Sequence, residues 1–108
     1  MTTNSIEYCV VLVTVATEAQ AQEIAQVLLS KKLAACVNIF PVNSMYVWQS
    51  KLNQDYEWQL LIKTNVNQFD LLAQKIKAIH SYEVPEIIAL PIINGLQSYL
   101  NWIDSNLS

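Results

Sequence analysis

The sequence of 108 residues contains a single glycine, Gly95. A loop that cradles phosphate, or a turn that binds a dinucleotide, needs several glycines so that the backbone can approach the ligand closely. The sequence also lacks the HExxH, CxxC and GxSxG motifs of zinc proteases, dithiol redox proteins and serine hydrolases. These absences argue against the common nucleotide-binding and catalytic classes, and we expect no enzyme activity.

Charged side chains are also scarce, at 14% of the residues against a typical ~25%. The six basic residues are spread along the chain, and the formal net charge is −3. Nucleic-acid binding depends on clustered Lys and Arg, so we expect no nucleic-acid partner. A surface with little charge favours self-association, because like charges keep chains apart.

The sequence shows neither a targeting segment nor a membrane span. The N-terminal MTTNSIEYC has no basic region before its apolar run, and Glu7 interrupts that run, unlike a signal peptide. No apolar run reaches the ~18–20 residues of a membrane span. The two cysteines, Cys9 and Cys36, are too few for a disulfide framework. We therefore predict a cytoplasmic protein with free thiols and no membrane partner, folded as one domain over residues 1–108.

Hydrophobic periodicity predicts the element order β-α-β-β-α-β-α. The expected strands are residues 6–15, 34–49, 54–64 and 86–93, with a turn at 51–55 between the middle two. Two crossovers that flank a hairpin are typical of the ferredoxin-like fold, an α+β architecture with helices on one face of an antiparallel sheet. The last helix is then an addition at the C-terminus.

Capping residues place the ends of these helices. Thr17 fits the N-cap of the first helix, with Gln20 completing a capping box. Asn67 is expected to cap the second helix and Gly95 to open the third. Pro85 lacks a backbone donor and restricts the residue before it, so the second helix must end by about residue 81.

The second predicted strand is long for a domain of this size. Fully extended at ~3.3 Å per residue, residues 34–49 would reach roughly 50 Å, whereas a compact domain of about 100 residues has a radius of gyration near ~13 Å. The hairpin must therefore bend at Pro41 or project beyond its own domain. Its aromatic side chains predict contact with a partner subunit; they are Tyr46, Trp48, Tyr56 and Trp58.

The segment IHSYEVPEIIALPII, residues 79–93, contains the residues best suited to chemistry. It includes the only histidine, His80, and two carboxylates, Glu83 and Glu86, on either side of Pro85. A rigid joint between a helix and a strand holds side chains in fixed directions, as a binding site requires.

Lys63 is the only cation in the apolar stretch 58–66, where a charge is seldom left unpaired. It could form a salt bridge with Glu83, Glu86 or Glu57, or it could bind a small anion. We expect one shared pocket near a subunit boundary for Lys63, His80, Glu83 and Glu86.

Five segments spread over nearly the whole chain resemble the CutA divalent-cation-tolerance proteins. They are LAACVNI (33–39), SMYVWQSKL (44–52), LLIKT (60–64), HSYEVPEIIALPI (80–92) and YLNWI (99–103). The resemblance implies a ferredoxin-like protomer in a tight homotrimer, with an architecture like that of PII signalling proteins. It also implies a role in tolerance to copper and other divalent metals, and it brings no enzyme activity with it.

The copper ligands usually proposed for this family are only partly retained. Some bacterial members carry a cysteine at the end of the first strand and two adjacent histidines before the Ser-Tyr step. The corresponding residues are Val13, Ile79 and His80, so one imidazole remains. Together with Glu83 and Glu86, His80 is expected to hold copper or another divalent cation weakly, with at most micromolar affinity, and no cofactor is required.

The candidate residues also have structural interpretations, which the sequence leaves open. His80 could cap the last carbonyls of the second helix. Cys36 could be a small buried hydrophobe or a thiolate ligand. Trp48 and Trp102 could anchor an interface or line a ligand pocket. The residues expected to line that pocket are Cys36, Trp48, Lys63, Tyr82 and Trp102.

Three functions are consistent with these patterns. The first is a CutA-type trimer that senses or buffers by binding a metal or a small anion. The second is a structural or interaction scaffold with no metal binding of its own. The third is a small hydrolase or oxidoreductase in which Cys36 is the nucleophile and His80 the base.

Overall fold

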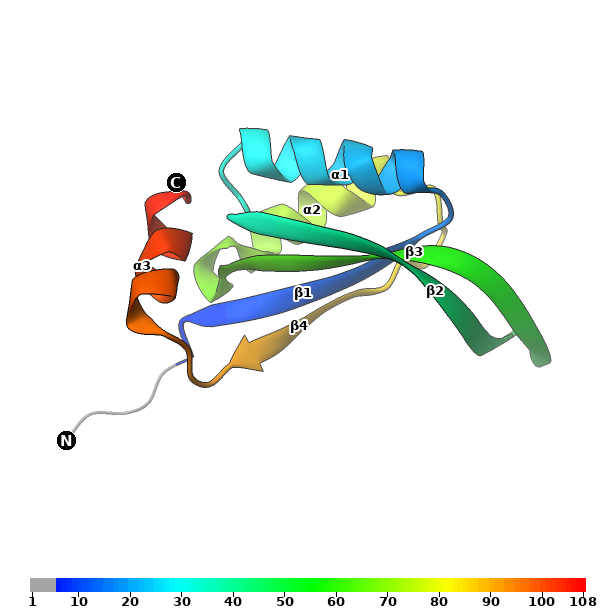
Figure 1. Cartoon of the computed structure of the whole chain (residues 1–108). Coiled ribbons are helices and arrows are strands. Elements are labelled where there is room, and N and C mark those ends of the chain that lie inside the picture. The colour runs from blue at the N-terminus through cyan, green and yellow to red at the C-terminus, as the bar shows by residue number, and fades with distance from the viewer. Residues whose placement is uncertain (1–5) are drawn as a thin grey trace.

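The computed structural model describes residues 6–108, so most of the N-terminal segment used above to argue against a signal peptide lies outside the described residues. The chain forms a four-stranded antiparallel sheet in the order β2-β3-β1-β4 (Figure 1). The strands are β1 (Tyr8–Val15), β2 (Cys36–Trp48), β3 (Lys51–Asn65) and β4 (Ile87–Ile92). The helices are α1 (Glu18–Ser30), the 3-10 turn η1 (Val66–Gln68), α2 (Phe69–Ile79) and α3 (Gln97–Ser105). The predicted α+β fold with an antiparallel sheet and an additional C-terminal helix is confirmed.

Helices α1 and α2 lie over one face of the sheet, and the core fills the space between these layers (Figure 1). Strand β1 alternates between buried and partly exposed residues; Val11 and Val13 are fully buried on the helix side. Leu60 and Ile62 of β3 are also fully buried. Complete burial of such a side chain contributes about 1.5–3 kcal/mol, so this layer accounts for much of the stability of the domain.

Helix α1 begins as the sequence predicts, but the capping box is only half formed. The Thr17 side chain accepts a hydrogen bond from the Gln20 amide at 3.1 Å. The Gln20 side chain does not return to the cap. Its Nε2 donates instead to the Ile79 carbonyl at 3.2 Å. Gln20 therefore connects the start of α1 to the end of α2.

Helix α1 ends in a Schellman motif without glycine. The Leu33 amide donates to the Leu28 carbonyl at 2.9 Å and the Lys32 amide to the Leu29 carbonyl at 3.1 Å. Lys32 has φ 58°, in the left-handed region. That conformation is strained for a side chain with a Cβ and relaxed for glycine.

Lys32→Gly is therefore expected to stabilise the fold by about 1 kcal/mol. The matched control is Lys31→Gly one residue earlier, where φ is −93° and glycine brings no relief of strain. Urea unfolding monitored by circular dichroism should give a higher midpoint for Lys32→Gly and an unchanged or lower midpoint for Lys31→Gly. Equal midpoints for the two variants would contradict the strain at residue 32.

Two predicted boundaries are wrong. The hairpin turn consists of Gln49 and Ser50, both with positive φ, rather than residues 51–55. Trp48 pairs directly with Lys51, which leaves a two-residue loop. Asn67 is not the cap of α2 either, because the chain first makes the turn η1, whose amide at Asn67 is capped by Asn65 at 2.9 Å.

The long hairpin both bends and projects. Beyond the central sheet its two strands curve away together and extend past every other element (Figure 1). The radius of gyration is 14.9 Å and the longest dimension is 49 Å, compared with a radius near ~13 Å for a compact domain. Pro41 and Pro91 both lie in edge strands, where a missing backbone donor is tolerated.

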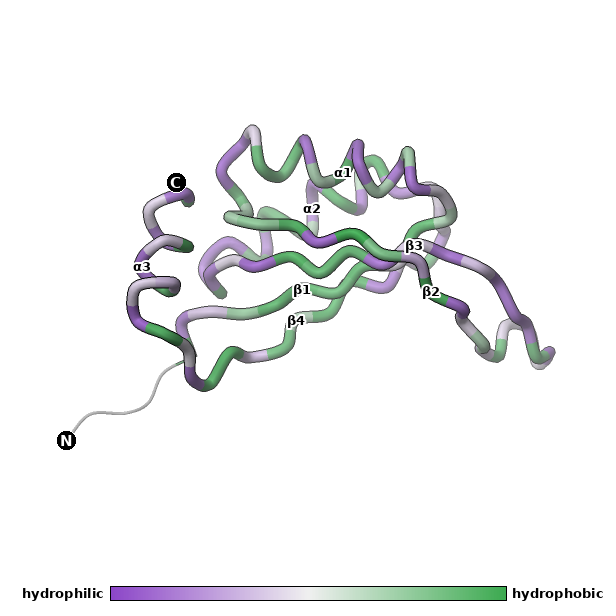
Figure 2. The backbone as a smooth tube through the Cα atoms, in the orientation of Figure 1, coloured by the Kyte–Doolittle hydropathy of each residue, from purple (hydrophilic) through white to green (hydrophobic). Residues whose placement is uncertain are grey.

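Apart from α3 at one end, where Lys63 lies over the Tyr99 ring, the face of the sheet opposite α1 and α2 carries no helix (Figure 1). Strand pairing places a set of mostly apolar side chains on this open face. They are Val10, Leu12, Phe40, Leu61, Ile88, Leu90 and Ile92, with Cys36, Asn38, Gln59 and Lys63. Figure 2 shows hydrophobic residues along β1 and β4, although no helix lies beneath them. The usual alternation of buried apolar and exposed polar residues is thus replaced by a sheet that is apolar on both faces.

The aromatic side chains of the hairpin do not all lie on one face of it. Tyr46 and Trp48 continue the open face, since the strand alternation places them on the same side as Phe40. Tyr56 lies on the opposite side and is 81% exposed. Trp58 is further from the tip and packs against the core.

Candidate functional site

A pocket of about 610 Å³ lies where the hairpin leaves the sheet. One wall comes from the hairpin and the other from the joint that connects α2 to β4, while Thr14 at the end of β1 lies between them. The lining residues are Thr14, Ser44, Met45, Tyr46, Trp48, Glu57, Ser81, Tyr82, Glu83, Val84 and Glu86. Of the candidate site residues named from the sequence, four line this pocket: Trp48, Tyr82, Glu83 and Glu86. The other four do not: Cys36, Lys63, His80 and Trp102.

His80 holds the joint in place through both of its ring nitrogens. Nε2 lies 2.8 Å from the Thr14 carbonyl oxygen, and Nδ1 lies 3.0 Å from the Tyr82 amide nitrogen. A carbonyl accepts and an amide donates, so Nε2 carries the proton and Nδ1 uses its lone pair. His80 thus connects the end of β1 to the segment that carries Tyr82.

The joint has further anchors on the helix side. The His80 amide donates to the Ile76 carbonyl at 2.8 Å, which ends α2 before Pro85 as predicted. The Ser81 hydroxyl donates to Oε1 of Gln20 at 3.0 Å. Residues 79–82 are therefore held to α1, α2 and β1, and this positions the Tyr82 ring over the pocket.

Tyr82 and Glu57 form the polar centre of the pocket. The Tyr82 hydroxyl donates to Oε2 of Glu57 at 2.5 Å. Burial, followed by this hydrogen bond to the carboxylate, raises the pKa of Tyr82 above its ordinary value. The phenol therefore stays protonated and acts as a donor at neutral pH. Glu57 is only 7% exposed, and Tyr82 is the residue that donates a side-chain hydrogen bond to it.

The expected metal site does not fit this geometry. Within residues 6–108 no group of three or more His, Cys, Asp or Glu side chains is arranged to hold a metal ion. A neutral imidazole binds a metal through its free lone pair, and the lone pair of His80 is already used on the Tyr82 amide. Within one chain His80, Glu83 and Glu86 thus form no group that could hold a metal ion, and weak cation binding by these residues stays a prediction.

Lys63 does not join the pocket. It pairs with Val10 of β1 and Cys36 of β2, whereas Thr14 at the pocket is four residues further along β1, or roughly 13 Å. The expectation of one pocket shared by Lys63, His80, Glu83 and Glu86 is thus wrong within one chain. Residue order places Lys63 and the strand that follows residue 86 in one sheet, but it does not specify the strand register that separates them.

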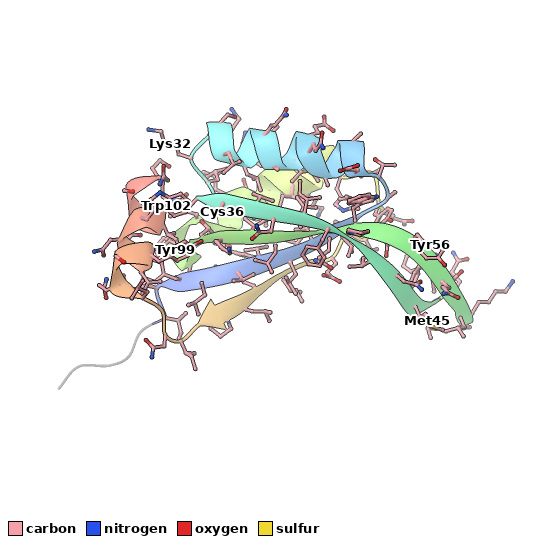
Figure 3. All side chains as sticks on the ribbon, in the orientation of Figure 1. Lys32, Cys36, Met45, Tyr56, Tyr99 and Trp102 are labelled. Atoms are coloured by element: carbon pink, nitrogen blue, oxygen red, sulfur yellow. The ribbon has the colours of Figure 1, made fainter. Side chains whose placement is uncertain are left out.

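Lys63 lies instead beside two stacked aromatic side chains of α3, Tyr99 and Trp102. Its ammonium lies 5.7 Å from the centre of the Tyr99 ring, and that ring stacks on Trp102 at 5.6 Å. Figure 3 shows Tyr99 and Trp102 on α3 and Cys36 toward the same end of the molecule, with Met45 at the far end on the hairpin. Cys36, Lys63 and Trp102 are thus excluded from the pocket to which they were assigned.

The same separation contradicts the Cys36–His80 catalytic pair. Cys36 is a partly buried free thiol at the Lys63 end of the sheet, while His80 contacts Thr14 at the opposite end of β1. The second thiol, Cys9, is buried in the core, and burial raises its pKa, so it remains a thiol.

Glu57 is the pocket residue whose role the sequence did not reveal. It was considered only as a salt-bridge partner for Lys63, but six residues of extended strand separate the two, or about 20 Å. The alternation of side chains along the hairpin strands did indicate the position of Glu57. Glu57 and Asp55 fall on the same face of the hairpin as Tyr46, whose hydroxyl donates to Asp55.

Comparison with known proteins agrees with the fold. A family model described as CutA1 divalent ion tolerance protein matches residues 9–106. A divalent-cation tolerance protein CutA from Thermus thermophilus is 48% identical over 98 residues, covering 90% of this chain and 95% of that protein. The protein of the same name from Yersinia pestis is 43% identical, covering 96% and 91%.

Solved structures give the same result. A structure described as the periplasmic divalent cation tolerance protein CutA from Archaeoglobus fulgidus superposes with a TM-score of 0.92 at 40% identity, covering 94% of this chain and 99% of that chain. CutA1 from Oryza sativa superposes with a TM-score of 0.91 at 41% identity, covering 98% of both chains.

None of the helices within residues 6–108 has the length and apolar character needed to span a bilayer.

Proposed function

Because the chain belongs to the CutA1 divalent ion tolerance family, we propose that it acts as a homotrimer in the response to divalent cations, copper included. Its relatives are named for tolerance and not for a reaction, and we propose that this chain likewise binds or scaffolds without catalysis. We further propose a PII-like sensing role, in which the subunits would associate through the open faces of their sheets.

The observation that carries this proposal is the apolar open face of the sheet. Ile88 is 48% exposed, Leu90 46% and Phe40 39%, and they adjoin Leu12 and Leu61 on the neighbouring strands. A contiguous apolar surface of this kind marks an interface between proteins. A second and a third copy of the chain would cover it, as the low surface charge also favours.

The projecting hairpin supports the same assembly. Its distal half has no core of its own, and Val47 and Leu52 are 71% and 70% exposed although they pair with each other. A two-stranded ribbon is marginally stable by itself in water. Contact with a neighbouring subunit would bury these side chains and hold the ribbon in place.

The geometry at His80 favours one alternative, a scaffold that responds to cations without a metal centre of its own. Both ring nitrogens are used in hydrogen bonds, so a tight copper site in one chain would require that joint to be broken. Thermal melting with CuCl₂ and with EDTA separates the alternatives, since a metal that binds the native state raises the melting temperature by mass action. A scaffold without a metal site would have the same melting temperature in CuCl₂ as in EDTA.

We place this function in the cytoplasm because both cysteines have free thiols, and thiols persist in a reducing compartment. Fractionation of cells that express the chain tests this placement. Recovery of the protein with periplasmic markers would contradict it.

Growth of a bacterium that lacks its own CutA, on medium with raised copper, tests the function as a whole. The wild-type chain is expected to restore growth. Leu90→Asp on the open face should fail to do so, whereas Leu71→Asp on the outer side of α2 should restore it. Restoration by an equally expressed Leu90→Asp protein that is monomeric would show that assembly is not required.

A further inference from the structure

Glu57 is a buried carboxylate without a cationic partner in the described part of the chain. Its Oε2 accepts the Tyr82 hydroxyl, a neutral donor, and no described residue donates to Oε1. No buried side-chain oxygen in this part of the chain lacks a partner, so Oε1 must be accessible. The residue is 7% exposed and lines the pocket, so the space that Oε1 reaches is the pocket itself.

The charge of the pocket is one-sided. Glu57, Glu83 and Glu86 line it, whereas no lysine or histidine does, and the chain contains no arginine. The lysine that comes nearest in the strand register is Lys51, opposite Trp48, and its side chain is exposed at the hairpin turn. A buried carboxylate in such surroundings calls for a cation from outside the chain.

The walls of the pocket are aromatic. Tyr46, Trp48 and Tyr82 line it together with Met45. The faces of aromatic rings attract organic cations, and such rings arranged around an acidic group are the usual means of recognising quaternary ammonium compounds. A pocket of about 610 Å³ is within the size range of small-molecule sites.

We infer that this pocket binds a small organic cation, an ammonium compound with apolar substituents, with its charged nitrogen near Oε1 of Glu57 and its substituents against the rings. An inorganic divalent ion fits less well, because it needs several converging oxygen or nitrogen ligands, and within residues 6–108 no such group exists. An anion would be repelled by the three carboxylates. The inference concerns a different ligand from the metal response proposed above. Because Tyr46 and Trp48 continue the open face, the ligand would lie at a subunit boundary in the proposed trimer.

Choline and its neutral isostere 3,3-dimethylbutan-1-ol form a matched pair of probes, since they differ by a charged nitrogen in place of carbon. Titration calorimetry of the wild-type protein is expected to show choline binding in the millimolar range or tighter, and at least 10-fold weaker binding of the neutral isostere. Equal affinity for both probes, or no choline binding up to about 20 mM, would overturn the inference.

Glu57→Gln is the decisive variant because it keeps the shape of the side chain and an oxygen that can accept the Tyr82 hydroxyl. Choline affinity should fall at least 10-fold, while the melting temperature and the particle mass stay close to wild type. Glu23→Gln, on the exposed side of α1, is the charge-matched control and should bind choline like wild type. Unchanged affinity in a folded Glu57→Gln protein would locate the choline site elsewhere and overturn the inference.

One further outcome identifies a different occupant. A lysine from a second copy of the chain could supply the missing cation in the assembled protein. In that case choline would bind the dissociated Leu90→Asp variant and not the wild-type assembly, and the inference of a free ligand would be overturned. The particle mass is measured in the same samples, so this result is distinguishable from failure of the trimer proposal.

Discussion

Leu90→Asp is expected to reduce the mass of the particle in solution from three chains to one. Leu90 lies on the open face of the sheet, opposite Val10, where the proposed interface would bury the new carboxylate in each subunit. The desolvation of a buried, unpaired charge costs several kcal/mol, and the assembly would contain three of them. Light scattering coupled to size-exclusion chromatography at micromolar concentration measures the mass directly.

The control for this experiment is Leu71→Asp. Leu71 is 49% exposed and Leu90 is 46% exposed, so the two substitutions differ chiefly in the face of the molecule that they change. Leu71 belongs to α2, on the other side of the sheet, and its replacement should leave the mass at three chains. A monomeric wild-type protein, or a trimer that tolerates Leu90→Asp, would contradict an interface on the open face.

His80→Ala is expected to lower the free energy of unfolding by about 2–4 kcal/mol, with copper present or absent. The substitution leaves the Thr14 carbonyl and the Tyr82 amide without their partners, and each unsatisfied group costs about 1–3 kcal/mol. Denaturant unfolding at one protein concentration, in CuCl₂ and in EDTA, measures the loss. The concentration must be fixed because subunit association contributes to apparent stability.

The same measurements distinguish a positioning role from a ligand role for His80. If His80 held copper, the metal would stabilise the wild type, and His80→Ala would remove that increment without a comparable loss in EDTA. Ser81→Ala is the control, since it removes one exposed hydrogen bond to Gln20 and should cost no more than about 1 kcal/mol. A His80→Ala protein as stable as wild type in EDTA would contradict the positioning role.

The sequence by itself determined those features that depend on neighbouring residues. The Thr17 cap lies three residues from the amide that it accepts, and the end of α2 at Ile79 follows from the restriction that Pro85 imposes on the residues before it. The element order, and with it the ferredoxin-like fold, follows from apolar periodicity along the chain. The length of the hairpin indicated that it would either bend or project, because a strand has a nearly constant rise per residue.

Only the tertiary structure decided where the chemically capable side chains meet. Strand register separates Lys63 from the pocket. Lys63 pairs with Val10, four residues before Thr14 at the pocket, and each residue of a strand adds about 3.3 Å along its axis. The tautomer of His80 depends on Thr14, 66 positions away in the chain, and the hydrogen-bond donor to Glu57 is Tyr82, 25 positions away. Hydrogen bonds of this kind depend on how three elements pack together, and residue order alone does not specify that packing.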